Sequence, residues 1–333
     1  NRNTGISYSG GTTPSINRYY DGATKGKGKL WYSLSYNVHP TSGQLAYSYT
    51  IIDSYDEMGR AKAGSQQFLT NNGTTWKSYP MSRTFDIAGN VKTQSYPSTR
   101  STSYNYDNAA RISSFSGNIG DGVSRTYADS FTFNAQGQIK KERFGTVTAL
   151  YHNTHYNSRG QAVDIRLGNS SGDEWTWNRG ALITYFSNQA RSAGNAFLNA
   201  TDNNGNVTMQ EHYVPTDDAY SSYAIPLRDT YEYDYLNRVT IANGVQRTTS
   251  GSWPSVYAQG YSYDRWGNRS INAGATWGAN IYNTVITPNT ANNRLNGLTY
   301  DAAGNTTNDP ITGAGTRTYD AENRMTLALK SGS

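Results

Sequence analysis

A six-residue unit recurs along the chain and constrains the fold more than any other feature of the sequence. Each copy has an aromatic residue, Asp or Asn, two variable residues, a small residue and a polar residue, as in YDAAGN at 300–305. Its best copies use the following positions: Tyr55, Asp56, Gly59, Phe85, Asp86, Gly89, Tyr106, Asp107, Tyr233, Asp234, Tyr263, Asp264, Gly267, Tyr300, Asp301, Gly304, Tyr319 and Asp320. Such self-similarity is typical of repeat proteins, so we expect one array of about eleven units.

Each unit is predicted to be the turn of a β-hairpin. Aromatic and polar residues alternate before it, as at 261–263, which places alternate side chains on one face of a sheet. The Asp or Asn side chain can accept a hydrogen bond from the backbone two residues on, and Gly or Asn three positions later tolerates the left-handed conformation that closes the bend. A second alternating run then returns, as at 238–241. Spacings of 19 to 45 residues between copies predict loops of variable length at the other end of the hairpins.

The composition favours an all-β chain. Only 35% of the 333 residues are hydrophobic, but there are 28 Tyr and 7 Trp, and tyrosine suits half-buried sheet surfaces. The net charge is +5, yet the basic residues are scattered singly, so we expect no nucleic-acid partner. No apolar run approaches the roughly 18 residues of a membrane span. The absence of cysteine excludes disulfides, thiolate metal sites and a Cys nucleophile.

The organisation of the chain is predicted to be simple. No shift in composition divides it, so we expect a single segment over 1–333, with longer insertions near 162–200 and 214–229. The chain starts at Asn1 without a signal peptide, and neither end resembles a cap. We therefore expect a fragment of a longer chain, whose edges continue into further repeats of that chain or pair with neighbouring copies.

Candidate reactive residues occur in contexts that argue against catalysis. Ser170 lies in GNSSG at 168–172, which matches the nucleophile-elbow pattern of hydrolases, but the flanking residues predict a loop. His152 and His155 have a metal-ligand spacing only on a helix, and their surroundings predict a strand with the two side chains on opposite faces. His39 and His212 are the remaining histidines.

Two further sets of side chains are candidates for chemistry. The adjacent carboxylates at 173–174 and 217–218 are interpreted as solvated loop charges, not a glycosidase pair. Exposed aromatics could instead stack on sugars, and a glycan-binding protein is expected to cluster several tryptophans on an outer patch: Trp76, Trp175, Trp177, Trp253 and Trp277. We predict no catalytic, cofactor or metal site, and we expect the protein not to be an enzyme.

The repeat resembles that of the Rhs/YD-repeat family, named for its Tyr-Asp dipeptide. Residues 300–305 and 319–324 match its consensus almost letter for letter. The resemblance implies a spiralling sheet of hairpins that forms part of a hollow shell, as in polymorphic bacterial toxins, insecticidal toxin complexes and teneurin receptors. In many bacterial members the shell encloses a C-terminal toxin, which an aspartyl self-cleavage centre at Asp-Pro-x-Gly-Leu releases. The Asp-Pro here, Asp309-Pro310, lies between two repeats and lacks that continuation, so it is interpreted as a turn.

The function expected from the resemblance is structural. We expect a non-enzymatic, secreted or cell-surface shell segment, without cofactors, that encloses or carries a toxin-like polypeptide. Its expected partners are further YD repeats, that cargo and, as a candidate, a cell-surface glycan. The alternative is an extracellular adhesion or carbohydrate-binding module that uses exposed aromatics.

Overall fold

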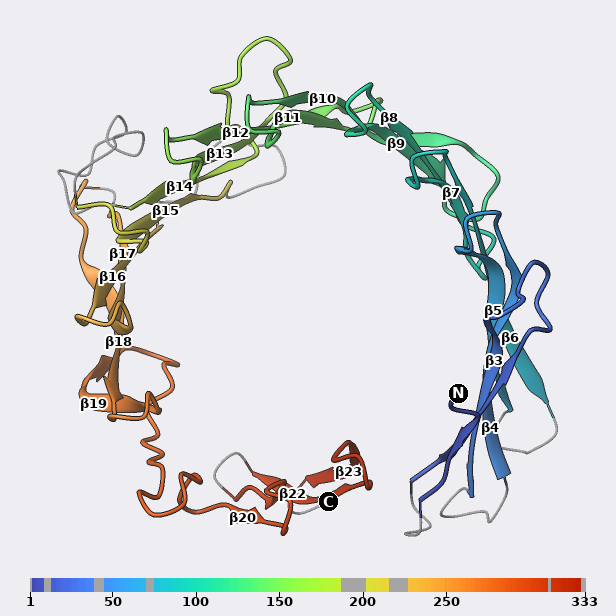
Figure 1. Cartoon of the computed structure of the whole chain (residues 1–333). Helices are drawn as coiled ribbons and strands as arrows, with labels where there is room; N and C mark the ends of the chain where they lie inside the picture. The colour runs from blue at the N-terminus through green and yellow to red at the C-terminus, as the bar shows by residue number, and fades with distance from the viewer. Residues whose placement is uncertain are drawn as a thin grey trace. The chain divides into compact units, whose positions relative to one another are not determined.

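The computed structural model describes residues 2–8, 13–38, 45–69, 75–186, 202–215, 227–248, 250–310 and 313–330 (Figure 1). These residues form strands and loops, with no helix among them. The main sheet has 19 antiparallel strands, and two further hairpins stand outside it. The predicted all-β fold class is confirmed. Within the described ranges, no helix is long and apolar enough to cross a membrane.

The chain divides into two compact units, and the first combines Asn1–Arg125 with Gly297–Ser333. In this unit, strands β1 to β9 pair antiparallel with one another in the order of the sequence. The remaining four strands form two separate hairpins, β20–β21 and β22–β23. Its strands are β1 (Gly5–Ile6), β2 (Ser15–Tyr20), β3 (Leu30–Val38), β4 (Leu45–Tyr55), β5 (Ala61–Leu69), β6 (Trp76–Phe85), β7 (Val91–Ser95), β8 (Ser101–Tyr106), β9 (Ile112–Asn118), β20 (Thr299–Tyr300), β21 (Thr306–Asn308), β22 (Ala314–Tyr319) and β23 (Met325–Lys330).

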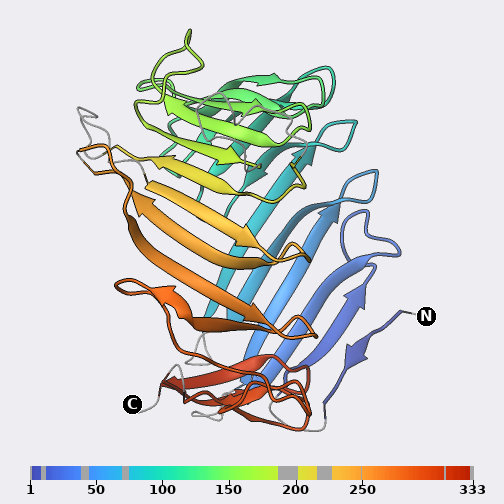
Figure 2. The same ribbon diagram turned by 90° about the vertical axis from the view of Figure 1, so that its left-hand side faces the viewer.

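The second unit covers Thr126–Asn296, and its consecutive strands also pair antiparallel (Figure 2). Its strands are β10 (Arg125–Phe133), β11 (Ile139–Phe144), β12 (Leu150–Tyr156), β13 (Ala162–Gly168), β14 (Gly180–Tyr185), β15 (Met209–Tyr213), β16 (Leu227–Tyr233), β17 (Val239–Gln246), β18 (Ser255–Tyr263) and β19 (Arg269–Trp277). A small core forms where Val163, Ile183, Tyr185 and Met209 are buried together on β13, β14 and β15.

The repeat units join neighbouring strands as tight hairpins. The unit at 55–60 joins β4 to β5, and the pairing register shifts beside the turn, where Tyr55 pairs with Ala61. A similar shift occurs beside the turns that follow Phe85, Tyr106 and Tyr233. This pattern is typical of a three-residue loop that ends in a left-handed residue, so each copy of the repeat sets both a turn and a local bulge.

The two predicted insertions are only partly described. Within 162–200, β13 and β14 are regular strands of the second unit, while residues 187–201 lie outside the described residues. Within 214–229, β16 begins at Leu227, and residues 216–226 lie outside the described part. The prediction that 1–333 is one continuous array stays a prediction.

Candidate functional site

The same set of polar contacts recurs in the repeat turns of both units. In the turn at 55–60, Asp56 Oδ1 accepts the N–H of Met58 at 3.0 Å and that of Arg60 at 2.9 Å. Its Oδ2 accepts Arg60 Nε at 2.6 Å. Gly59 donates its N–H to the Asp56 carbonyl at 2.9 Å and has a φ of +81°. One carboxylate therefore holds the backbone and the last side chain of the turn in one conformation.

In other copies too, the side chain of the last residue of the unit binds the Asp carboxylate. Asn90, Asn268 and Asn305 donate their amide groups to Asp86, Asp264 and Asp301. Arginine takes this role in the pairs Asp107–Arg111, Asp234–Arg238 and Asp320–Arg324.

These hydrogen bonds favour the ionised form of the turn aspartates. The Asn90 side chain lowers the pKa of Asp86, and the Asn268 side chain lowers the pKa of Asp264. The Arg111 side chain and backbone do the same for the pKa of Asp107. Since the hydrogen bonds outweigh the opposing effect of desolvation, the carboxylates are built into the turn in their charged state.

The tyrosine that opens each unit binds the preceding hairpin. Tyr55 Oη donates to the Leu30 carbonyl at 2.6 Å, and Leu30 is the first residue of the strand that returns from the previous turn. The same bond recurs, at 2.7 to 2.9 Å, in the pairs Tyr20–Asn3, Tyr106–Val91, Tyr156–Ile139, Tyr233–Val207, Tyr263–Val239 and Tyr319–Thr306. We call this recurrent contact the tyrosine ladder. It explains why tyrosine predominates at the position, because the hydroxyl binds a backbone acceptor of the preceding hairpin.

A cation of one turn also packs on the aromatic ring of a neighbouring turn. The Arg238 guanidinium lies 4.4 Å from the centre of the Tyr263 ring. Arg60 lies at the same distance from the ring of Phe85, which has no hydroxyl to bind the preceding hairpin. Cation–π contact therefore adds to the tyrosine ladder at Tyr263 and operates without the ladder bond at Phe85.

The candidate nucleophile Ser170 and the carboxylate of Asp173 serve turn structure. Ser170 lies in the loop after β13, as predicted, and its Oγ accepts the Asp173 N–H at 3.1 Å. Asp173 in turn accepts the Trp175 N–H at 2.9 Å and the Thr176 hydroxyl at 2.8 Å. The pair at 217–218 lies outside the described residues.

The histidines occupy separate environments. His152 and His155 lie on strand β12, as predicted, and at this spacing a strand directs them to opposite faces. His152 Nδ1 lies 2.9 Å from Glu142 Oε1, whereas the His155 ring stacks on Trp175 with ring centres 4.0 Å apart. His212 Nε2 lies 3.1 Å from Asp229 Oδ2, and His39 lies outside the described residues. Over the described part of the chain, no three His, Asp or Glu side chains are grouped to hold a metal ion.

A buried polar cluster in the second unit was not predicted. Glu211, with 3% of its surface exposed, accepts the Tyr185 hydroxyl at 3.0 Å and also binds Arg228 Nε. The Arg228 guanidinium lies 3.5 Å from the centre of the Trp253 ring. Burial and the Glu211 charge raise the pKa of Tyr185. Both carboxylate oxygens are occupied by donors of the protein itself, which favours a structural role over a catalytic one.

The candidate glycan-binding tryptophans have different neighbours. Trp175 stacks on His155, Trp177 meets Tyr213 edge to face at 4.9 Å, and Trp253 lies under Arg228. Trp277 is half exposed on β19. In the first unit, Trp76 ends a row of aromatic rings on strands β2, β3, β4 and β6, formed by Tyr19, Tyr32, Tyr49 and Trp76.

Comparison with known proteins bears on the fold. No family model matches the sequence, and a search of the curated proteins finds no match either. Among solved structures, the chain is similar to the TcdB2–TccC3–Cdc42 crystal structure, with a TM-score of 0.65 and 17% identity over 97% of this chain. It is also similar to the Photorhabdus luminescens Tc holotoxin pore (TM-score 0.64, 17% identity) and to TcdB2–TccC3 without its hypervariable C-terminal region (0.64, 18%), each over 97% of this chain. The matches cover only 17% or 18% of those chains. The fold of this chain is thus one found within Tc toxin structures.

Proposed function

We propose that this chain is a structural, non-enzymatic wall segment of an Rhs/YD-repeat protein, and that the wall encloses or carries another polypeptide. The observation that supports it most is the tyrosine ladder, which repeats one backbone contact from hairpin to hairpin through both units. These contacts join each hairpin to the preceding one, which is a structural role in the sheet. The fold likeness to TcdB2–TccC3 over 97% of the chain supports the same proposal.

The proposed setting follows from that role. A wall of this kind belongs to a larger assembly, in which further YD repeats of the same protein or of neighbouring copies continue the sheet. The enclosed polypeptide is the proposed cargo, and we propose a secreted or cell-surface location for the assembly. We propose no cofactor for the wall, and the polar groups of its repeat turns serve the turns and the contacts between hairpins.

Protease protection tests the enclosure. The native protein that contains these repeats is treated with a nonspecific protease before and after mild denaturation, and the fragments are identified by mass spectrometry. We expect a stretch of sequence outside the repeats to survive digestion in the native state and to be cut once the sheet is unfolded. Cleavage of every segment outside the repeats at the same rate in both states would contradict enclosure.

A carbohydrate-binding module is the second candidate, on the strength of the aromatic row in the first unit. The Tyr19 and Tyr32 rings stack with centres 4.3 Å apart, and Tyr19 and Trp76 are 42% and 46% exposed. Half-exposed rings of this kind can stack on sugars. A glycan array that shows binding by the native protein, lost in Trp76→Ala and kept in the turn variant Trp266→Ala, would favour this function over the wall.

A further inference from the structure

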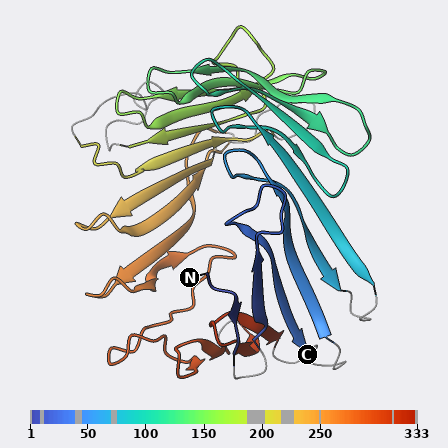
Figure 3. The same ribbon diagram turned by 45° about the vertical axis from the view of Figure 1, so that its right-hand side comes forward.

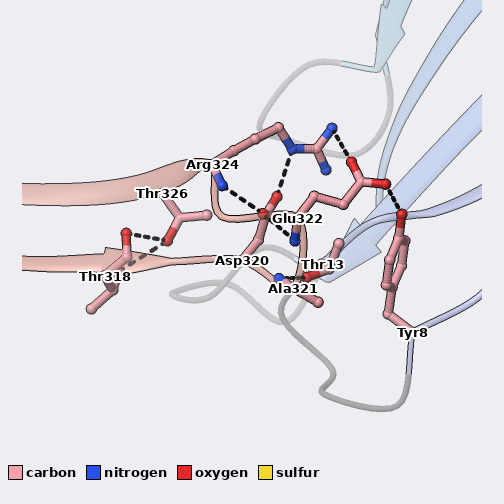
Figure 4. A network of polar contacts seen from close by, with 8 residues as sticks. All are labelled: Tyr8, Thr13, Thr318, Asp320, Ala321, Glu322, Arg324 and Thr326. Atoms are coloured by element: carbon pink, nitrogen blue, oxygen red, sulfur yellow. Dashed lines mark hydrogen bonds and ion pairs between the residues drawn. The ribbon is translucent and has the colours of Figure 1, made fainter. Parts of the chain in front are cut away.

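The last repeat turn binds residues from the beginning of the chain. In this turn, at 320–324, the Ala321 N–H donates to Thr13 Oγ1 at 2.6 Å (Figure 4). The Tyr8 hydroxyl donates to Glu322 Oε1 on the same turn. Thr13 is buried, with 5% of its surface exposed. Both ends belong to the first compact unit, and Figure 3 shows the C-terminal hairpin beside the first strands.

The carboxylate that Tyr8 contacts distinguishes this turn from the others. Glu322 occupies the third position counted from the Asp or Asn of the unit. In the other copies that position holds Ala23, Met58, Ala88, Ala109, Gln136, Arg159, Asn204, Leu236, Trp266 or Ala303. None of these is acidic, so only the last turn offers a carboxylate to a tyrosine hydroxyl at this place.

The turn orients that carboxylate with its own arginine. Arg324 donates Nε to Asp320 Oδ2 at 2.8 Å and pairs through Nη1 with Glu322 Oε2, also at 2.8 Å. The second oxygen, Oε1, is the one that accepts from Tyr8 (Figure 4). The arginine thus holds Glu322 in place from one side, and Tyr8 binds it from the other.

The second position of the turn is also used differently here. The side chain at this position is exposed in Ile87, Tyr235 and Ala321 alike, so the difference lies in the backbone. In the last turn, the N–H of the second residue, Ala321, is bound by Thr13. Next to this contact, Pro14 and Ile16 line a groove together with Met325 and Thr326 of strand β23. The hydrogen bonds therefore lie at the edge of a groove that residues from both ends of the chain line.

We propose that Tyr8 and Thr13 form a clasp that selects the last repeat turn through Glu322 and ties hairpin β22–β23 to the first strands of the chain. Two strands alone are marginally stable and every residue of β23 is exposed, so this hairpin needs support from elsewhere. The ladder bond from Tyr319 to Thr306 supplies part of that support, and the clasp adds to it. The clasp is an interaction surface within the chain for one particular turn. It does not depend on an enclosed polypeptide.

Hydrogen exchange on the whole chain tests the clasp. In Thr13→Ala and Glu322→Gln, we expect amides of residues 314–330 to exchange several-fold faster, and about tenfold faster when the two changes are combined. Amides of β16 and β17 in the second unit should keep their rates. Glu57→Gln is the matched control, because Glu57 is a turn glutamate bound to Lys25 instead of to the clasp.

A replacement series at Tyr8 separates recognition of the carboxylate from general packing. Tyr8→Phe should lose protection of 314–330, whereas Tyr8→Lys, which restores a donor, should regain it only while Glu322 is present. Wild-type exchange of 314–330 in Glu322→Gln and in Thr13→Ala, with unchanged circular dichroism, would overturn the proposal. If Thr13→Ala does not fold, Glu322→Gln decides, because that side chain lies on the exposed face of the turn.

Discussion

Tyr263 places its hydroxyl 2.7 Å from the Val239 carbonyl oxygen, and Tyr106 places its hydroxyl 2.9 Å from that of Val91. In each case the acceptor is the first residue of the strand that leaves the previous repeat turn. The ring supplies packing area and the hydroxyl supplies a directed bond, so a single side chain both buries apolar surface and fixes the position of the neighbouring hairpin. Phe85 provides only the first of these contributions.

Removal of one ladder hydroxyl is expected to destabilise the fold measurably. Tyr263→Phe should lower the free energy of unfolding by about 1 kcal/mol, because the change deletes a hydrogen bond and leaves a half-buried carbonyl without its donor. Chemical denaturation monitored by circular dichroism measures the effect. Tyr235→Phe is the control, since Tyr235 is 90% exposed on a turn. Equal stability of Tyr263→Phe and the wild type would argue against the ladder.

Acid is expected to destabilise the turns. Hydrogen bonds lower the pKa of Asp86, Asp264 and Asp301, and Arg125 lowers the pKa of Asp121 to about 2. Because unfolded aspartate titrates near pH 3.9, the unfolded chain binds more protons than the folded chain at acidic pH. The stabilisation is therefore complete above about pH 5 and is lost as pH falls towards 2.

The melting temperature, measured from pH 6 to pH 2.5, should fall most steeply below about pH 4. Asp264→Asn should melt lower than the wild type at pH 6 and show a smaller fall, because it lacks one titrating turn carboxylate. A melting temperature that rises on acidification would contradict this account of the turns.

At the scale of the hairpin, much of the structure could be predicted from local sequence. The Asp side chain that accepts backbone N–H groups and the positive φ of Gly267, +88°, follow from the residue types in the unit. The copy at 106–111 is less obvious, because Ala110 takes the glycine position with a φ of +58°. The ladder acceptors could not be identified from sequence, because Val207 and Tyr233 lie 26 residues apart and Val91 and Tyr106 only 15. Because the loops between repeats vary in length, the separation between a ladder tyrosine and its acceptor is not constant.

Substitutions at the fourth residue of the turn, counted from the Asp, are expected to change stability in opposite directions in two copies. Ala110→Gly should stabilise the chain by up to about 1 kcal/mol, since it relieves the left-handed strain of a residue with a Cβ atom. Gly267→Val should destabilise it by about 1 kcal/mol or more for the reverse reason, because nothing lies within 4 Å of an added Cβ and only backbone strain opposes the change. Thermal melting of both variants measures the effect, and a shift in the same direction for both would contradict the turn assignment.

At the scale of the whole chain, the contacts farthest apart in sequence were beyond prediction. Thr13 and Ala321 are 308 residues apart, and no local pattern connects them. The buried Glu211 cluster likewise draws Tyr185 and Arg228 from separate strands. By contrast, the all-β class follows from the repeat and the tyrosine content, because these features are distributed over the entire chain. The repeat therefore makes the all-β architecture predictable. The Thr13–Ala321 contact and the Glu211 cluster lie outside the repeat pattern and are specific to this chain.

We propose that these hairpins are a wall around another polypeptide. A cryo-EM map of the native protein isolated with everything attached to it is the most direct test. We expect strands β1 to β19 to lie in a continuous sheet of hairpins, with density for additional polypeptide on one face of that sheet and shielded from solvent. A map in which both faces of the sheet are open to solvent, with no polypeptide held against either, would contradict it.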